Sequence, residues 1–150
     1  MAKTYKNIYI PERTEIKKKH YLTGDVCLFR VVTESPFEYN PGQFFMVSLW
    51  GAGEVPISVA SLSDKKREIE FCIRRTGKVT SAIHELQEGD FLWIRGPYGR
   101  AFPLEYAIGR DVLIVGGGIG LAPLRPVLQW VLENKNSIKK ISLLYGARTP

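Results

Sequence analysis

Five residues at positions 116–120, Gly-Gly-Gly-Ile-Gly, carry the strongest chemical signature in the sequence. They follow a short apolar run at 112–115 and precede a segment of helical periodicity that begins at Leu121. Glycines let a phosphate approach the backbone closely, and the start of a helix offers free N–H groups and a positive dipole end. Because the cluster stands between a strand and a helix, we expect it to bind a dinucleotide phosphate. A tight turn without a ligand is the alternative.

The residues expected to contact this dinucleotide are Gly116, Gly117, Gly118, Ile119, Gly120, Ala122 and Pro123. Pro123 and Pro126 are both expected in the first turn of the helix, where backbone N–H groups have no acceptor within the helix. A second apolar strand is expected at 141–145, followed by Gly146-Ala147-Arg148 rather than by the acidic residue that usually binds a ribose. The segment therefore predicts a strand, a glycine-rich turn, a helix and a parallel strand.

A second anion site is expected where a short helix begins at Gly77, Lys78, Val79 and Thr80. Val79, Ile83 and Leu86 recur with helical spacing, so the first N–H groups of this helix lack partners. Plain capping of the helix by Thr80 is the alternative, and both functions are compatible. Arg74 and Arg75 precede the helix on a strand, so only one of them can face a bound anion; Arg74 is the candidate.

Short strands separated by turn residues dominate the first hundred positions, which is typical of a barrel or a sandwich. The expected strands are 14–21, which is polar and resembles an edge strand, and 25–33, 44–50, 56–61, 68–75 and 91–95. We expect one domain at 1–105 and the first part of a second at 106–150. A parallel sheet of two strands cannot cover both its faces, so a truncated chain, or completion by another segment, is expected.

Composition limits the classes of function. The 150 residues include 45% hydrophobic and 24% charged residues, as in ordinary globular proteins, and the net charge of +6 is scattered, which disfavours nucleic-acid binding. Cys27 and Cys72 are expected to be buried free thiols, and no cysteine–histidine cluster predicts a metal site. No signal peptide or membrane span is recognisable, so a cytoplasmic protein is expected. His84 is expected at the surface, and aromatic residues such as Phe45 and Trp50 in the core.

Five ordered segments resemble the ferredoxin–NADP reductase superfamily. Besides the glycine cluster, they are Pro41-Gly42-Gln43-Phe44, Pro56-Ile57-Ser58, Gly77-Lys78-Val79-Thr80 and Gly96-Pro97-Tyr98-Gly99. The resemblance extends particularly to the gamma subunits of cytoplasmic hydrogenases, to the flavin-binding subunit of anaerobic sulfite reductase and to the electron-transfer subunit of dihydroorotate dehydrogenase. It implies a six-stranded antiparallel Greek-key barrel that binds flavin, followed by the first βαβ unit of a doubly wound NAD(P)-binding domain.

The resemblance also implies site residues and activity. Pro56, Ile57 and Ser58 match the flavin motif Arg-x-Tyr-Ser/Thr, in which Val55 and Ile57 replace the Arg and the Tyr, and Ser58 keeps the hydroxyl near flavin N5. It implies FAD more than FMN, and hydride transfer from C4 of NAD(P)H to N5, with single electrons passing on to an iron–sulfur or catalytic subunit of the hydrogenase or sulfite reductase type. A [2Fe-2S] centre is expected only in a region beyond this sequence.

Two alternatives to this function remain. One is a free-standing NAD(P)H:flavin reductase, which would release reduced flavin instead of passing electrons to a bound subunit. The other is a flavin-binding fragment without turnover.

Overall fold

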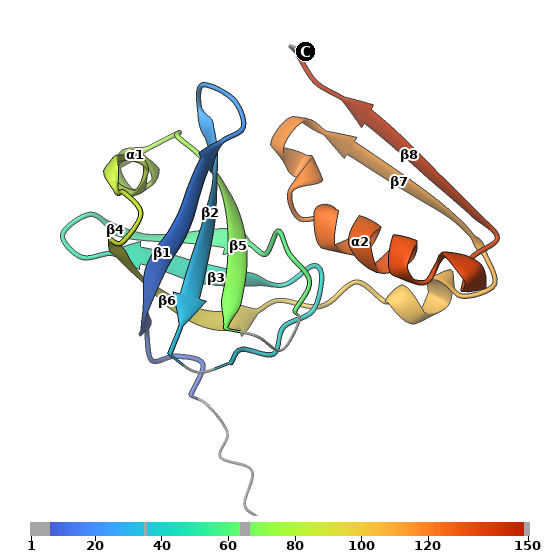
Figure 1. The fold of residues 1–150 in the computed structure, drawn as a ribbon, viewed down its shortest axis with the longest axis horizontal. Helices are drawn as coiled ribbons and strands as arrows, with labels where there is room; N and C mark the ends of the chain where they lie inside the picture. Colours follow the sequence, from blue (N-terminus) through green and yellow to red (C-terminus); the bar gives the residue numbers. More distant parts are fainter. Residues whose placement is uncertain (1–6, 35, 64–66, 149–150) are drawn as a thin grey trace, which may run out of the picture.

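The computed structural model describes residues 7–34, 36–63 and 67–148, which form a barrel and a smaller βαβ unit (Figure 1). The barrel contains β1 (Glu12–Tyr21), β2 (Val26–Thr33), β3 (Phe44–Leu49), β4 (Gly53–Ser58), β5 (Glu68–Arg74), α1 (Lys78–Glu85) and β6 (Phe91–Tyr98). The βαβ unit contains β7 (Asp111–Gly117), α2 (Arg125–Glu133) and β8 (Lys140–Gly146). Single 3-10 turns lie at Leu104–Ala107, Gly118–Leu121 and Lys135–Ser137.

The barrel is one antiparallel sheet in the order β4-β3-β6-β1-β2-β5. Strand β6 comes last in the sequence but lies between β3 and β1, which is the crossover of a Greek key. The two outer strands meet where Val59 bridges Phe71 and the Ala60 N–H donates to the Glu70 carbonyl over 2.8 Å. The predicted six-stranded Greek-key barrel is therefore confirmed.

Alternating side chains fill the barrel, as the period of a strand requires. Phe29, Phe45 and Phe71 are completely buried. Phe45 lies at the centre, with its ring 5.2 Å from that of Phe37 and 5.9 Å from those of Tyr39 and Phe71. The expectation for Phe45 is thus confirmed, whereas that for Trp50 is wrong. Trp50 follows β3 in the hairpin turn, where 76% of it is exposed.

Strand β1 is not at the edge, contrary to its polar sequence. Its first half pairs with β6 from Glu12 to Glu15, and nearly its whole length pairs with β2. The register shifts between Ile16 and Lys18, and the lysines lie in the second half of the strand, beyond the stretch that pairs with β6. There Lys19 instead donates from its backbone N–H to Glu88 Oε1 over 3.0 Å. Buried Thr14 and Ile16 show where the strand faces the core. The run of lysines thus indicates an edge-like environment for the second half of β1 only.

Helix α1 packs onto the barrel through Ile83, which is fully buried. His84 is also buried, with 2% exposed, so the surface position expected for it is wrong. Its Nε2 lies 3.0 Å from the Ile73 carbonyl oxygen, and its ring contacts those of Phe29 and Tyr21 edge-on. The helix buries a wider face than the spacing of its aliphatic residues indicates.

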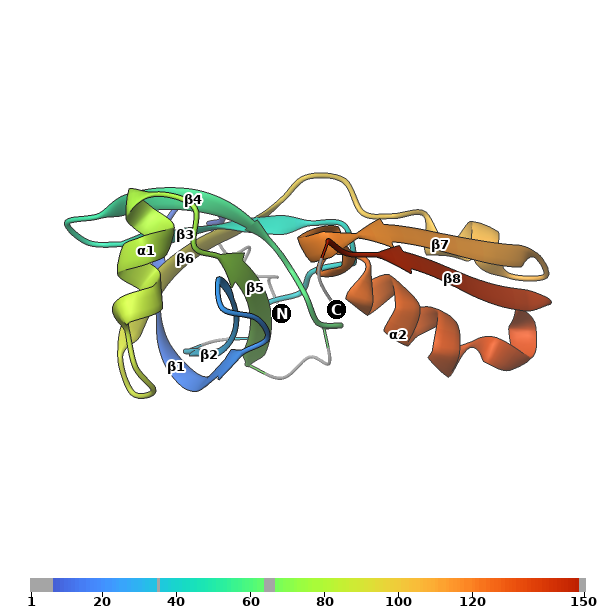
Figure 2. The same ribbon diagram turned by 90° about the horizontal axis from the view of Figure 1, so that it is seen from above.

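In the βαβ unit, β7 and β8 pair in parallel from Asp111–Lys140 to Gly117–Gly146, and α2 lies along one face of this pair (Figure 2). The predicted unit is confirmed, but α2 begins at Arg125 rather than near Leu121. A 3-10 turn occupies Gly118–Leu121, so Pro123 precedes the helix, and only Pro126 lies in its first turn.

The other face of the β7–β8 pair carries exposed apolar side chains. Leu113 and Val115 of β7 are 61% and 62% exposed, and Leu144 of β8 is 58% exposed. They alternate with Ile114, which is buried beneath α2. The continuous apolar run of β7 predicted a strand covered on both faces. In the described residues α2 covers one face of β7, and the other face is exposed.

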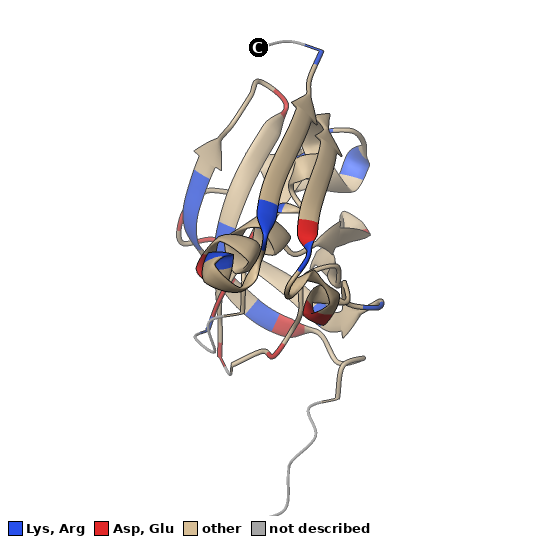
Figure 3. Cartoon of the chain, turned by 90° about the vertical axis from the view of Figure 1, so that its right-hand side faces the viewer, with Lys and Arg blue, Asp and Glu red and all other residues tan. Residues whose placement is uncertain are grey.

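Charged residues are spread over both parts. On the side that carries the βαβ unit, lysines and arginines occupy several separate elements and alternate with acidic residues (Figure 3). Among the described residues, no helix is both long and apolar enough to cross a membrane.

Candidate functional site

A large hollow lies between the barrel and the βαβ unit. Its volume is about 1450 Å³, above the range of about 300–1000 Å³ that is usual for small-molecule sites. The barrel contributes the turn between β1 and β2 and the outward side chains of β2 and β5, among them Cys72 and Arg74. The βαβ unit contributes the glycine turn, the end of β8 and the two residues after it, from Tyr145 to Arg148. Two segments far apart in the sequence thus line one site.

The glycine turn forms one wall. Gly116 and Gly117 end β7, and Gly118 opens the 3-10 turn with a φ of +50°, a backbone conformation that side chains disfavour. A Cβ atom on Gly118 or Gly120 would have no neighbour within 4 Å, so it would project into open space that a ligand could occupy. Of the predicted residues, Gly117, Gly118, Ile119 and Ala122 line the hollow, whereas Gly116, Gly120 and Pro123 do not.

Arg74 forms the opposite wall, as expected from its position on β5. Its Nε donates to Asp25 across the rim, with 3.0 Å between Nε and Oδ2. Arg75 instead pairs with Glu85 of α1 and does not line the hollow. Strand alternation therefore separates the two arginines as expected. The predicted cation is at the site, with a carboxylate partner that a bound anion would have to displace.

The helix start at 77–80 does not line the hollow. Thr80 is buried, and its Oγ1 accepts hydrogen bonds from the N–H groups of Thr76 and Gly77, both at 2.9 Å. The hydroxyl thus caps the helix, which is the alternative that the sequence left open. The following N–H groups, beginning at Lys78, have no acceptor within the helix. Only two residues separate Arg74 from Gly77, so an extended ligand can reach both.

The proposed flavin motif lies on β4, which is one of the two outer strands of the barrel sheet. Val55 and Ile57 pack against the barrel core, so they stand where an inward side chain is needed. Ser58 is partly buried and does not line the hollow, nor do Pro56 and Ile57. Ala60 does line it, two residues further along. Side chains two apart in an extended chain point the same way, so the side chain of Ser58 is expected on the same side as that of Ala60.

Cys72, expected to be a buried free thiol, is free but only partly buried, and it lines the hollow. It lies between the buried Phe71 and Ile73 on β5, so it shares the outward face of Arg74. Burial, with a smaller effect of the nearby Cys27, raises the pKa of the Cys72 thiol to about 11. The thiol therefore stays protonated at neutral pH and is a weak nucleophile. Its spacing of two residues from Arg74 was the available signal.

These features fit a flavin and a dinucleotide. The walls combine aliphatic surface, on which a ring system can pack, with a guanidinium at the rim and an open glycine turn. The glycine turn and the 77–80 helix start each offer backbone donors to phosphate. Among the described residues, no group of three or more His, Cys, Asp or Glu side chains is placed to hold a metal ion.

Comparison with known proteins agrees with this arrangement. Residues 13–102 match the model of the family described as oxidoreductase FAD-binding domain, and residues 114–150 match that of the oxidoreductase NAD-binding domain. The chain therefore belongs to the FAD-binding oxidoreductase domain family and continues into a NAD-binding domain. This membership gives flavin and NAD(P)H as the cofactors of the two domains.

Similar curated proteins include subunits of a sulfhydrogenase and of dihydroorotate dehydrogenase B. The gamma subunit of sulfhydrogenase 2 from Pyrococcus furiosus is 45% identical over 77% of this chain and 40% of its own length. A probable dihydroorotate dehydrogenase B electron-transfer subunit from Methanothermobacter thermautotrophicus is 47% identical over 93% of this chain and 50% of its own length. The expected resemblance to both kinds of subunit is confirmed. The chain spans about half the length of the curated relatives that it matches.

Solved structures show the same fold. The NADH-dependent reduced ferredoxin-NADP oxidoreductase, studied for flavin-based electron bifurcation, superposes with a TM-score of 0.78 at 30% identity, over 91% of this chain and 49% of the other. The ferredoxin reductase of carbazole 1,9a-dioxygenase superposes with a TM-score of 0.82 at 24% identity, over 94% of this chain and 44% of the other.

Proposed function

We propose that this chain is the flavin-binding part, and the beginning of the nucleotide-binding part, of a subunit that passes electrons from NAD(P)H to a redox partner. The observation that carries the proposal is the hollow lined on one side by Arg74 and on the other by Gly117 and Gly118. It brings a flavin-binding barrel and a nucleotide-binding turn to a shared space. Flavin supplies the step from two-electron to one-electron chemistry when bound.

In this proposal the protein groups bind and orient. The glycine turn binds a phosphate of NAD(P)H, and the N–H groups from Lys78 to Thr80 donate hydrogen bonds to the flavin pyrophosphate. Arg74 exchanges its contact with Asp25 for a ligand phosphate. Ser58 lies beside the reacting end of the flavin and offers a hydroxyl to it. Because hydride transfer needs no protein acid or base, the protonated thiol of Cys72 is compatible with the reaction.

The division into domains at 1–105 and 106–150 belongs to the same proposal, and the family matches at 13–102 and 114–150 support it. We propose FAD rather than FMN, since the separate anion site at 77–80 suits a dinucleotide. The partner is an iron–sulfur or catalytic subunit, as the subunit names of the relatives indicate. A [2Fe-2S] centre outside this sequence stays a prediction. We place the protein in the cytoplasm, where thiols such as Cys27 and Cys72 remain free.

Titration of the flavin-free full-length protein with FAD and with FMN, followed by anaerobic addition of NADH or NADPH, tests the proposal. We expect FAD to bind more tightly and the bound flavin to be bleached by at least one nucleotide. Arg74→Gln should weaken flavin or nucleotide binding, whereas Arg75→Gln, which alters the neighbouring cation outside the hollow, should not. Failure to bind either flavin would contradict the proposal.

A further inference from the structure

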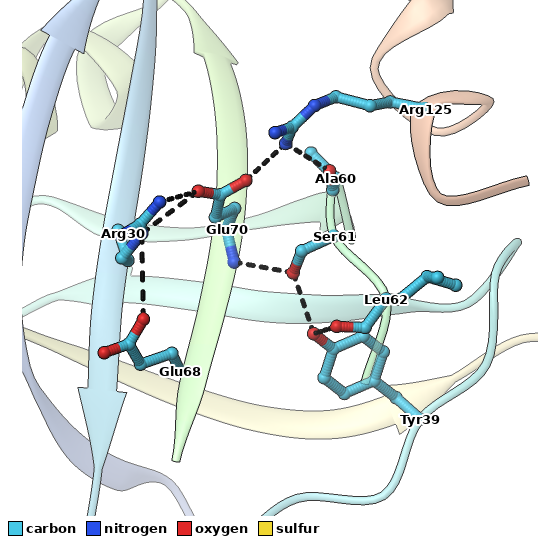
Figure 4. A network of polar contacts seen from close by, with 8 residues as sticks. All are labelled: Arg30, Tyr39, Ala60, Ser61, Leu62, Glu68, Glu70 and Arg125. Atoms are coloured by element: carbon cyan, nitrogen blue, oxygen red, sulfur yellow. Dashed lines mark hydrogen bonds and ion pairs between the residues drawn. The ribbon is translucent and has the colours of Figure 1, made fainter. Parts of the chain in front are cut away.

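Glu70 is a buried carboxylate that joins the barrel to the βαβ unit (Figure 4). On one side it accepts two hydrogen bonds from Arg30 of β2, from Nε at 3.1 Å and from Nη2 at 2.8 Å. On the other side its second carboxylate oxygen accepts a charge-assisted hydrogen bond from Nη1 of Arg125. Only 6% of Glu70 is exposed, so the carboxylate is held between two cations away from most water.

The surroundings of Glu70 hold it rigidly. Its backbone N–H donates to Ser61 Oγ over 3.1 Å, and Ser61 Oγ lies 2.8 Å from the Tyr39 hydroxyl. Tyr39 also donates to the Leu62 carbonyl oxygen over 3.1 Å. Burial by itself would raise the pKa of the Glu70 carboxyl, but the hydrogen bonds and charges of Arg125 and Arg30 outweigh it and lower that pKa. Glu70 is therefore ionised at physiological pH.

Arg125 connects this cluster to the cofactor hollow. It lines the hollow and is the first residue of α2, with three residues between it and the 3-10 turn Gly118–Leu121 that follows the glycine-rich end of β7. Its Nη1 also donates to the Ala60 carbonyl oxygen over 2.7 Å. Ala60 and Glu70 belong to the two strand segments whose contact closes the barrel. The guanidinium of Arg125 thus connects the start of α2 to the two strand segments that close the barrel.

We propose that Glu70 is a positioning residue that, through Arg125, fixes the glycine turn opposite the flavin-binding face of the barrel. This inference rests on the proposed function. The hydrogen bonds to the Ala60 carbonyl and the Glu70 carboxylate use Nη1 of Arg125, and Arg125 also lines the hollow, so a direct phosphate ligand acting through Nε and Nη2 is the contrasting role. Each role predicts a different kinetic change.

Placement of this kind affects rate more than affinity. Transfer between two bound reactants requires them to be about 3–3.5 Å apart, and a misplacement of about 1 Å can cost roughly a hundredfold in rate. A turn that can still bind the nucleotide but is free to shift would retain affinity and lose rate. We therefore expect the loss of the Glu70–Arg125 contact to lower the rate constant of flavin reduction at saturating nucleotide, with a smaller change in the nucleotide Kd.

The test uses the flavin-loaded full-length protein and the variants Glu70→Gln and Glu68→Gln. Glu68 lies two residues away on the same strand, contacts the same Arg30 at 3.8 Å and is exposed, so it is a matched control for charge. In anaerobic stopped-flow measurements we expect E70Q to reduce its flavin about tenfold or more slowly at saturating nucleotide, and E68Q to stay within about twofold of wild type.

Arg125→Gln removes the other half of the contact from a side chain that is 42% exposed, which limits the risk of misfolding. We expect R125Q to match E70Q in rate and to change the Kd little. A second readout needs no cofactor chemistry: hydrogen exchange of residues 117–128 should accelerate in E70Q and R125Q relative to E68Q, while barrel strands β1 and β2 stay protected.

The outcomes distinguish a failure of the positioning role of Glu70 from a failure of the proposed function. If wild type is reduced normally and E70Q matches it in rate and in exchange, the positioning role is overturned and the proposed function stands. If R125Q weakens nucleotide binding without changing the saturated rate, Arg125 is a phosphate ligand, and the inference is again overturned. If wild-type protein with bound flavin is reduced by neither nucleotide, the proposed function fails, and this inference fails with it.

Discussion

The barrel and the βαβ unit show two different ways of burying apolar surface. The barrel closes on itself, and its central side chains, Phe45 among them, have no exposed surface. The core of the βαβ unit consists of Ile114, Val127, Val131 and Ile138, of which only Val131 is completely buried. Its sheet also presents apolar side chains such as Leu113 outward. The barrel is thus stabilised within itself, whereas the βαβ unit depends on contacts outside its own core.

This difference has a consequence for function. The barrel can provide a rigid flavin surface, while the glycine turn takes its position partly from the Glu70–Arg125 clamp to the barrel. Elements that bury little apolar surface open more readily than a closed core. We therefore expect the position of the glycine turn to respond more readily than the barrel wall to sequence changes or to a bound ligand. A further segment packed over Leu113 and Val115 would have the same influence.

The largest effect is expected from opening a cavity in the barrel core. Phe45→Ala removes a fully buried ring that contacts three other aromatic rings, so it should lower the free energy of unfolding by about 3–5 kcal/mol. Flavin affinity should fall with it. Urea unfolding followed by circular dichroism measures the change. Trp50→Ala, a larger truncation at a 76% exposed site, should cost less than about 1 kcal/mol; equal losses would contradict the assigned core.

A smaller and more local effect is expected in the βαβ unit. Val131→Ala removes a fully buried side chain from α2 and should cost about 1–2 kcal/mol, because fewer atoms are lost than in Phe45→Ala. Hydrogen exchange should accelerate in β7, α2 and β8 but not in the barrel. Leu132→Ala, at a 51% exposed neighbour, is the control and should change little. Faster exchange throughout the barrel in V131A would show that the two regions unfold as one unit.

The glycine turn permits a test with matched backbone strain. Gly118 and Gly109 both have a positive φ, +50° and +70°, and a Cβ atom on either would have no neighbour within 4 Å. Alanine at each position should therefore cost a similar amount, about 1–2 kcal/mol of stability. Only Gly118 lines the hollow, so G118A should weaken nucleotide binding several-fold, whereas G109A should not. Calorimetric titration with NADH and NADPH would detect the difference, and equal Kd values would contradict the assigned nucleotide wall.

The smallest effect concerns the pH dependence of stability. Burial raises the Cys72 pKa from its ordinary value of 9.0 to about 11, so the folded protein holds this proton more tightly than the unfolded chain does. The stability that this contributes is fully present below pH 9 and is lost as the pH rises through 11. We expect a decline in Tm over this interval that is smaller in Cys72→Ala. The same decline in wild type and C72A would assign it to other groups.

Much of the fold could be predicted because strand alternation and helical spacing are local signals. Residues 68–75 showed which side chains of β5 face inward, and the glycine cluster identified the turn after β7. The polar second half of β1 obscured its pairing with β6, and His84 lies on a wider buried face than its neighbours Val79, Ile83 and Leu86 indicate.

The candidate site was predicted in parts rather than as a whole. Arg74 and part of the glycine cluster line the hollow, but Ser58 and the 77–80 helix start do not. The Glu70–Arg125 contact joins positions 55 residues apart, and neither residue belongs to a motif. Such a contact depends on how the barrel and the βαβ unit meet, which no local periodicity encodes.

The central claim is that the barrel and the glycine turn share one cofactor site. Hydrogen exchange of the full-length protein, measured without ligand, with FAD, and with FAD plus NAD(P)H, tests it most directly. We expect FAD to protect β5 near Arg74 and the start of α1, and the added nucleotide to protect residues 117–122. Protection by either ligand confined to the opposite barrel face around Trp50 and Trp93, with residues 117–122 and β5 unchanged, would contradict the account.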